Sequence, residues 1–311
     1  MSRALVFPGQ GAQTIGMGKA LAEAYPAAQA VFDEVDEALG EKLSDLIWEG
    51  EIETLTLTEN AQPALMATSM AALRALEAEG LGLEHVAFVA GHSLGEYSAL
   101  AAAGALSVTD TARLLRTRGQ AMQQAVPVGE GAMAAILGLG LETVTEVAAE
   151  AAQGDVCAAA NDNDPAQVVV SGNIAAVERA AALAKEKGAK RELMLPVSAP
   201  FHCALMAPAA EVMANALADV QIKVPRVPVV ANVRAEAVND PEQIRALLVE
   251  QVTHAVRWRE TVSWMATQGV DEIWEVGAGK ALIGMVRRIE RSIAVRNVSS
   301  PADVLSARDA A

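Results

Sequence analysis

The chain has 311 residues, of which 52% are hydrophobic and 20% charged, so it is long enough for one large globular domain and a smaller one. Its 24 basic and 39 acidic residues give a net charge of −15, which argues against nucleic-acid binding because a phosphate backbone would be repelled. Cys157 and Cys203 are too few for a disulfide framework and lack metal-site spacing, and no apolar stretch is long enough to cross a membrane. We expect a monomeric cytoplasmic protein without a signal peptide, a metal site or a membrane partner.

Up to about residue 126, strand patterns alternate with helix patterns. Ala4–Phe7 predicts a strand that ends in the glycine-rich loop Pro8–Gln13. Apolar residues at helical spacing predict helices over residues 17–25, 26–39, 61–79 and 108–125. Because strands separated by helices pair in parallel, we expect a mainly parallel sheet covered by helices.

The pattern changes after residue 126. Strands are predicted over 132–137, 155–160, 167–171 and 190–197, and helices over 141–153 and 174–187. This βαββαβ order is the ferredoxin-like arrangement. We expect residues 127–197 to form an inserted ferredoxin-like subdomain.

The first pattern resumes after the insertion. Helices are predicted over 204–218, 241–253, 258–268 and 279–290, and strands over 227–231 and 271–275. The last dozen residues, rich in Ala, Ser and Asp, are expected to fray. The expected fold class is α/β, with residues 1–126 and 198–311 forming one large α/β-hydrolase-like domain.

A nucleophile elbow is predicted at Ser93, which is the centre of G-x-S-x-G between the apolar strand at 86–91 and an Ala-rich helix. Gly91 and Gly95 lack side chains where a tight strand-to-helix turn would otherwise clash. The main-chain N–H groups that follow, beginning with Leu94, are free donors at a helix N-terminus and could stabilise a developing oxyanion.

A serine nucleophile needs a base, and the chain has four histidines. His85 is expected at the surface, and His92 has a supporting place inside the elbow. His202 follows a strand in a loop and is the candidate base, although spacing alone does not exclude His254. No Asp or Glu stands where the α/β-hydrolase order of Ser, acid and His would require one, so we expect something other than a carboxylate to orient the base.

Six motifs occur in the order of one known family: Phe7–Gln13, Gly91–Ser98, Arg116–Met122, Pro200–Met206, Gln251 with Val256–Trp258, and Gly277–Lys280. Together they resemble the malonyl-CoA:acyl-carrier-protein transacylases of bacterial fatty-acid synthesis, and the resemblance covers essentially the whole chain. It implies a ping-pong transfer of malonyl from coenzyme A to the phosphopantetheine thiol of acyl carrier protein. No cofactor is implied, since the coenzyme A thioester is a substrate.

The resemblance also implies roles for the residues of the site. Ser93 would attack the thioester and form a malonyl-serine, while His202 takes its proton. The main-chain carbonyl of Gln251 would hold His202 in place of an acid. The main-chain N–H groups of Gln10 and Leu94 would form the oxyanion hole.

Substrate recognition follows from the same resemblance. Arg118 would pair with the free malonyl carboxylate, for which a two-pronged guanidinium is suited. His92 and Asn163 would line the same cleft, and Gln251 is also expected among the substrate-binding residues. Leu94 beside the nucleophile and Phe201 beside the base are bulky, which favours malonyl over methylmalonyl.

Arg287 and Arg288 are expected to dock the acidic carrier protein. A chain of net charge −15 needs a local positive patch for such a partner. The sequence departs from the pattern of the family it resembles at Asp164 and Ala166, where Ser and Gly are usual. It departs again at His254 and Ala255, where a small polar residue and a proline are common.

Three competing functions remain open. A serine esterase or thioesterase would resolve the acyl-serine with water, and a discrete acyltransferase of a polyketide synthase would use the same motifs. A non-catalytic carrier-binding module would not need Ser93 and His202, yet both are present.

Overall fold

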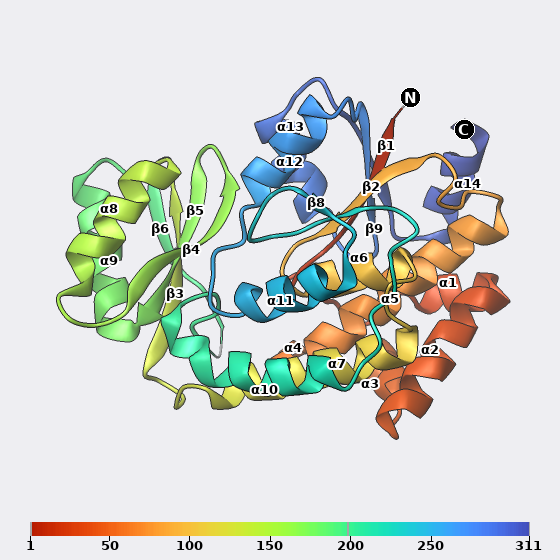
Figure 1. Ribbon diagram of the computed structural model, residues 1–311, viewed down its shortest axis with the longest axis horizontal. Coiled ribbons are helices and arrows are strands. Elements are labelled where there is room, and N and C mark those ends of the chain that lie inside the picture. Colours follow the sequence, from red (N-terminus) through yellow and green to blue (C-terminus); the bar gives the residue numbers. More distant parts are fainter. Residues whose placement is uncertain (1, 198, 311) are drawn as a thin grey trace.

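The computed structural model describes residues 2–197 and 199–310. A six-stranded sheet with helices on both faces forms the larger part of the molecule, and a smaller sheet with two helices lies at one end (Figure 1). No helix within the described residues is long and apolar enough to span a membrane.

The larger sheet has the strand order β10-β9-β1-β2-β7-β8. Its strands are β1 (Arg3–Phe7), β2 (Val86–Gly91), β7 (Val229–Val230), β8 (Ala237–Val238), β9 (Glu272–Val276) and β10 (Ala294–Val298). All neighbours pair in parallel except β7 and β8, which are antiparallel. The predicted mainly parallel sheet is confirmed.

Alternate residues of β1 face opposite sides of this sheet, as the two-residue period of a strand requires. Leu5 and Phe7 belong to the main core, whereas Ala4 and Val6 belong to a second core on the other face. The helices of the main-core side are α1 (Lys19–Ala24), α2 (Pro26–Leu39), α3 (Leu43–Glu49), α5 (Thr58–Ala78), α6 (Leu94–Ala102), α7 (Val108–Gln124), α10 (Ala207–Ala218), α11 (Pro241–Gln251) and α14 (Pro301–Ala310). The second core is covered by α12 (Trp258–Thr267) and α13 (Ala281–Ile289).

The smaller sheet is antiparallel, with the order β4-β5-β3-β6. Its elements are β3 (Gly131–Leu137), α8 (Leu141–Ala152), β4 (Cys157–Asp164), β5 (Gln167–Asn173), α9 (Ile174–Glu186) and β6 (Arg191–Met194). This is the predicted ferredoxin-like order. The predicted end of the insertion falls between 197 and 198, and Ser198 lies outside the described residues.

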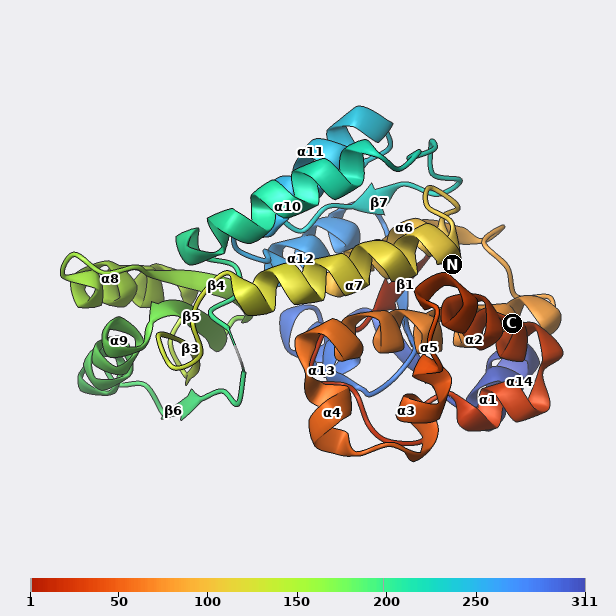
Figure 2. The same cartoon turned by 90° about the horizontal axis from the view of Figure 1, so that it is seen from below.

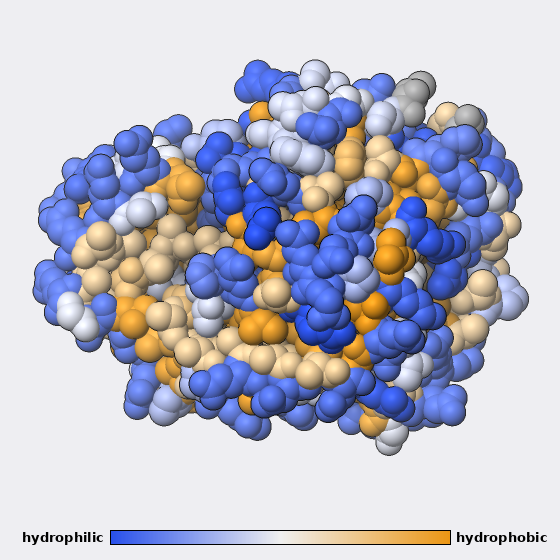
Figure 3. Space-filling view, viewed as in Figure 1, coloured by the Kyte–Doolittle hydropathy of each residue, from blue (hydrophilic) through white to orange (hydrophobic). Residues whose placement is uncertain are grey.

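The small sheet has one face covered by α8 and α9, and its other face packs against the larger part of the molecule. Ala134 and Ile136 of β3 lie under α8 and α9, while Met133 and Ala135 belong to the main core. Figure 2 shows α7 running beside α10 toward this sheet. Apolar residues gather between the two parts on the face shown in Figure 3.

Two buried carboxylates of β4 form ion pairs with helices of the larger part. Asp162 contacts Arg259 of α12 at 2.9 Å, and Asp164 contacts Arg288 of α13 at 2.7 Å. Burial raises the pKa of Asp162, and the hydrogen bonds from Arg259 oppose that shift. Asp164 therefore ties the small sheet to α13.

The C-terminal end differs from the prediction. Residues 301–310 form α14 where fraying was expected, and β10 before it was not predicted. The helix is held by tertiary packing, since Val304 and Ala307 are buried in the main core, and Pro301 suits its first position. The short helices α3 and α4 (Ile52–Thr56) were also not predicted.

Substitution of Gly95 tests the packing that brings α6 against β1. A Cβ on Gly95 would lie 2.2 Å from the carbonyl oxygen of Phe7, so Gly95→Ala should lower the free energy of unfolding by about 1–3 kcal/mol or more. Gly140→Ala is the matched control, because its Cβ would meet nothing closer than 4.0 Å, and its cost should stay within about 1 kcal/mol. Urea titrations that gave equal losses for both variants would contradict this packing.

Candidate active site

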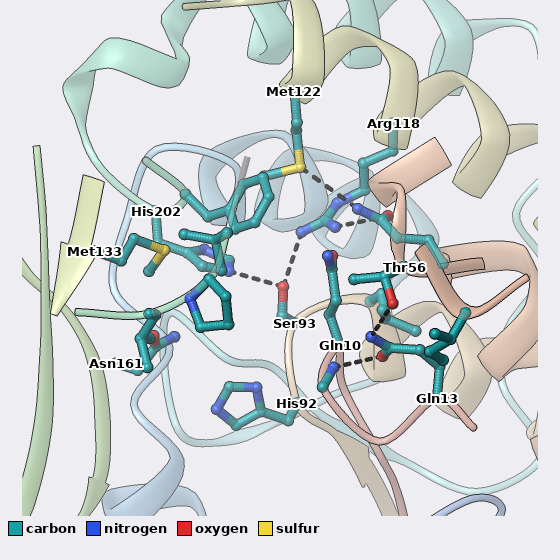
Figure 4. A pocket seen from close by; sticks show the side chains of 18 residues that line it. Gln10, Gln13, Thr56, His92, Ser93, Arg118, Met122, Met133, Asn161 and His202 are labelled. Carbon is teal, nitrogen blue, oxygen red and sulfur yellow. Dashed lines mark hydrogen bonds between the residues drawn. The ribbon is translucent and has the colours of Figure 1, made fainter. Parts of the chain in front are cut away.

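Ser93 lies at the sharp turn between β2 and α6. Its φ is 55°, a conformation that non-glycine residues rarely adopt and that stores strain. A Cβ on Gly91 would lie 1.9 Å from the carbonyl oxygen of Gly95, so neither glycine tolerates a side chain here. The structure thus forms the predicted elbow, with the serine hydroxyl exposed to a cavity (Figure 4).

The imidazole of His202 contacts this hydroxyl. Ser93 Oγ and His202 Nε2 are 2.7 Å apart, and Nδ1 of the same ring lies 2.9 Å from the carbonyl oxygen of Gln251 and 3.1 Å from that of His254. A main-chain carbonyl only accepts, so Nδ1 carries the proton and Nε2 is left to accept the hydroxyl proton of Ser93. Main-chain carbonyls orient this histidine where many hydrolases use a carboxylate.

The other three histidines have different roles: His92 lines the same cavity as this pair, and His85 and His254 do not. His85 is exposed, as expected, and His254 is exposed with its ring turned to the carbonyl of Glu250 at 2.9 Å. His254 therefore contributes its main-chain carbonyl to the site and not its imidazole. The Nε2 of His92 lies 2.9 Å from Oδ1 of Asn163, and burial lowers the pKa of this ring.

Arg118 of α7 brings a buried positive charge next to the serine. Its Nη2 donates to Ser93 Oγ at 3.1 Å and to Gln251 Oε1 at 2.9 Å, while Nη1 donates to Gln62 Oε1 at 2.8 Å. The residue is 1% exposed, and no carboxylate lies within ion-pair distance of it in the described parts of the chain. A guanidinium held only by neutral oxygens is available to an anionic ligand.

The cavity above Ser93 has a volume of about 510 Å³ and is bounded by both parts of the molecule. Leu94 and Phe201 line it, as expected for a pocket that leaves little room beside the reacting group. Gln10 lines it from the loop after β1, and no hydrogen bond from the main-chain N–H of Gln10 or Leu94 is found within residues 2–197 and 199–310. Two free donors therefore lie where an oxyanion could form.

Two predicted lining residues are placed differently. Asn161 lines the cavity where the sequence predicted Asn163, because Asn163 lies behind His92 and bonds its ring. Gln251 does not line the cavity either. It lies beneath the site, where it contacts His202 through its main chain and Arg118 through its side chain.

Sequence reasoning missed three buried polar residues around the elbow. Gln62 holds Arg118, and Asn232 accepts the N–H of Ser93 at 2.8 Å and donates to the carbonyl of Gly91 at 2.7 Å. Burial raises the pKa of Glu96, the third residue, to about 7. Glu96 stands within the motif Gly91–Ser98, which is a signal in the sequence, whereas no local pattern marks Gln62 or Asn232.

Comparison with known proteins places this geometry in a family. The model of the acyl transferase domain matches residues 4–300. The chain belongs to the acyl transferase family. Its elbow, its main-chain-oriented histidine and its buried arginine are therefore those of an acyltransferase with an α/β fold and a ferredoxin-like second sheet.

Individual members of the family match over nearly the whole chain. The malonyl CoA-acyl carrier protein transacylase of Bacillus subtilis is 48% identical over 299 residues, 96% of this chain and 93% of its own. The crystal structure of an acyl-carrier-protein-S-malonyltransferase from Bartonella henselae has a TM-score of 0.97 and 55% identity, covering 100% of this chain and 99% of its own. A malonyl-transacylase solved in complex with its type II polyketide-synthase acyl-carrier protein has a TM-score of 0.97 and 42% identity, and each chain is covered completely.

The electrostatics of this acyltransferase site keep His202 neutral. Burial, reinforced by the positive charge of Arg118, lowers the pKa of His202 from 6.5 to about 3. At neutral pH the imidazole is therefore uncharged and able to accept a proton.

This shift makes part of the stability depend on pH. Between pH 6.5 and about 3 the unfolded chain binds a proton at His202 and the folded chain does not. The free energy of unfolding is therefore unaffected by protonation of this histidine above pH 6.5 and falls as the pH is lowered through this range. The stability difference between the wild type and His202→Ala should therefore narrow by ~1.4 kcal/mol per pH unit below pH 6.5. Denaturant titrations at several pH values measure it, and a difference that stays constant from neutral pH to about pH 5 would contradict the shift.

Proposed function

We propose that the protein transfers malonyl from malonyl-CoA to the phosphopantetheine thiol of an acyl carrier protein through a malonyl-serine. The observation that carries this proposal is the unpaired guanidinium of Arg118, 3.1 Å from the hydroxyl of Ser93. The malonyl carboxylate is separated by one methylene from the carbonyl carbon that Ser93 attacks. A short diacid therefore presents its carboxylate where the guanidinium lies.

The acylation step uses the contacts of Ser93. His202 Nε2 takes the hydroxyl proton as Oγ bonds to the thioester carbon, and the main-chain N–H groups of Gln10 and Leu94 stabilise the oxyanion. The carbon–sulfur bond then breaks, and the proton on His202 goes to the departing coenzyme A thiol. In the second half-reaction His202 deprotonates the phosphopantetheine thiol, which attacks the malonyl-serine, and the proton returns to Ser93.

The shape of the cavity supports malonyl as the group transferred. Leu94 and Phe201 are both nearly buried at its wall, which disfavours a methyl branch on the carbon next to the thioester. One methyl group changes discrimination by about 1–3 kcal/mol in such a pocket, so we propose a preference for malonyl over methylmalonyl.

The carrier protein is proposed to dock near α13. Arg287 is exposed at the end of this helix, and no ion pair of Arg287 is found in the described ranges. Arg288 is half exposed, but its Nε is already bound to Asp164. We therefore propose that Arg287 carries more of the attraction for an acidic partner than Arg288 does.

Fatty-acid synthesis is the proposed pathway, since the chain matches stand-alone bacterial malonyl CoA-acyl carrier protein transacylases from end to end. Service to a type II polyketide synthase is the second candidate, favoured by the likeness to the transacylase solved with such a carrier protein. Monomeric state and cytoplasmic location stay predictions.

An acceptor experiment tests transfer against hydrolysis. With malonyl-CoA alone the enzyme should form a long-lived acyl-enzyme and little free malonate. Addition of a holo carrier protein should move the malonyl group onto its thiol, while the apo form, which lacks phosphopantetheine, should accept none. Mass spectrometry of a fatty-acid and a polyketide carrier separates the two pathways, and malonate released at the same rate with and without carrier would indicate a hydrolase.

Replacement of Arg118 tests the carboxylate contact. Arg118→Ala leaves the malonyl carboxylate without its partner, so the transition state for malonyl-CoA should lose about 2–5 kcal/mol of stabilisation and kcat/KM should fall accordingly. The kcat/KM for acetyl-CoA should fall much less. His202→Ala is the control, because it should slow both donors alike, by about 10²–10⁴. A malonyl-to-acetyl ratio unchanged in Arg118→Ala would remove this residue from substrate recognition.

A further inference from the structure

Glu96 is a buried carboxylate directly beneath the elbow. It lies in the first turn of α6 and is 3% exposed. Its Oε2 accepts two hydrogen bonds, from Gln251 Nε2 at 2.7 Å and from the main-chain N–H of Asn232 at 3.1 Å. It does not line the cavity. Any influence on the reaction must therefore pass through its neighbours.

The side chain of Gln251 connects Glu96 to Arg118. Its Nε2 donates to Glu96 Oε2 and to the carbonyl of Ser93 at 3.0 Å, while its Oε1 accepts from Arg118 Nη2 at 2.9 Å. An amide can be turned either way unless its partners decide between its nitrogen and its oxygen. Glu96 Oε2 and the Ser93 carbonyl both accept, so the amide nitrogen must face them and the oxygen must face Arg118.

Asn232 connects Glu96 to the strained backbone of the elbow. Its main-chain N–H is held by Glu96, its Oδ1 accepts the N–H of Ser93, and its Nδ2 donates to the carbonyl of Gly91. Strain such as that at Ser93 persists only where the surroundings over-determine the conformation. This second connection does not require a charge at Glu96, since an amide oxygen would accept the same N–H.

We propose that Glu96 is a positioning residue for acyl-group specificity: by accepting from Gln251 it fixes the amide so that its oxygen holds the guanidinium of Arg118 toward the malonyl carboxylate. The inference rests on the proposed function, because it concerns the residue that would recognise malonyl. Glu96 touches neither the substrate nor the reacting atoms.

The two variants Glu96→Met and Glu96→Gln test this contact together. Glu96→Met removes both hydrogen bonds that Oε2 accepts, so Glu96 no longer holds the amide of Gln251 and Arg118 is less well positioned. In Glu96→Gln one amide oxygen can replace Oε2 in both bonds, because the same oxygen accepts from Gln251 and from Asn232. Acylation by malonyl-CoA should suffer in Glu96→Met and be restored in Glu96→Gln, whereas acylation by acetyl-CoA, which presents no carboxylate to Arg118, should be largely retained in both.

The test is kcat/KM of acylation for malonyl-CoA and acetyl-CoA in the full-length wild type and in both variants. In Glu96→Met we expect the malonyl value to fall about tenfold or more, the effect of losing a hydrogen bond to a charged group, and the acetyl value to change less than about threefold. In Glu96→Gln both values should stay within about threefold of the wild type. The control is Glu275→Gln, another buried glutamate, which accepts main-chain N–H groups of α13 and should leave the ratio unchanged. An equal fall for both donors in Glu96→Met would overturn the proposal.

A variant at Gln251 keeps the test decisive if Glu96→Met does not fold. Gln251→Met removes the amide connection itself, so it must lower the malonyl-to-acetyl ratio, and an unchanged ratio would overturn the proposal. Where both single variants fold, the malonyl-to-acetyl ratio of kcat/KM should fall no further in the double variant, Glu96→Met with Gln251→Met, than in the more affected single variant. Additive losses of this ratio would contradict the proposal, because they would show that the two residues act separately. A wild type that accepts both donors equally would instead contradict the proposed function.

Discussion

A buried guanidinium with no carboxylate beside it is the constraint on which the rest of this site depends. Removing the charge of Arg118 from water is costly, and the protein offsets that cost with the oxygens of Gln62, Gln251 and Ser93 rather than with an ion pair. A direct carboxylate partner would occupy the place of an anionic substrate. The carboxyl group of Glu96 is instead kept one amide away.

The same charge shapes the chemistry of the neighbouring groups. Together with burial it lowers the pKa of His202 to about 3, so the imidazole stays neutral where it must accept a proton. Orientation of that ring by main-chain carbonyls, at Gln251 and His254, avoids a further buried carboxylate near Arg118. Recognition of an anion and activation of the serine are thus compatible because the acidic groups are kept out of the cavity.

The elements that depend on local sequence could be predicted, and those that depend on distant contacts could not. Ser93, Gly91 and Gly95 follow from the stereochemistry of one turn, and the βαββαβ insertion follows from periodicity. The helix at 301–310 was missed because burial against the main core, and not local propensity, holds it.

Within the site, long-range contacts account for what the sequence did not predict. Asn232 and Glu96 are 139 and 155 residues from the partners they hold, Ser93 and Gln251, so no local pattern could pair them. Asn163 was expected in the cleft but lies behind His92, since Asn161 of the same strand takes that place.

The central claim is that the hydroxyl of Ser93 accepts a malonyl group. The most direct measurement is the intact mass of the protein after brief incubation with malonyl-CoA, followed by peptide mapping of the modified residue. The account predicts a single malonyl adduct on Ser93 in the wild type and none in Ser93→Ala. A malonyl adduct on another residue, or one that persists in Ser93→Ala, would contradict it.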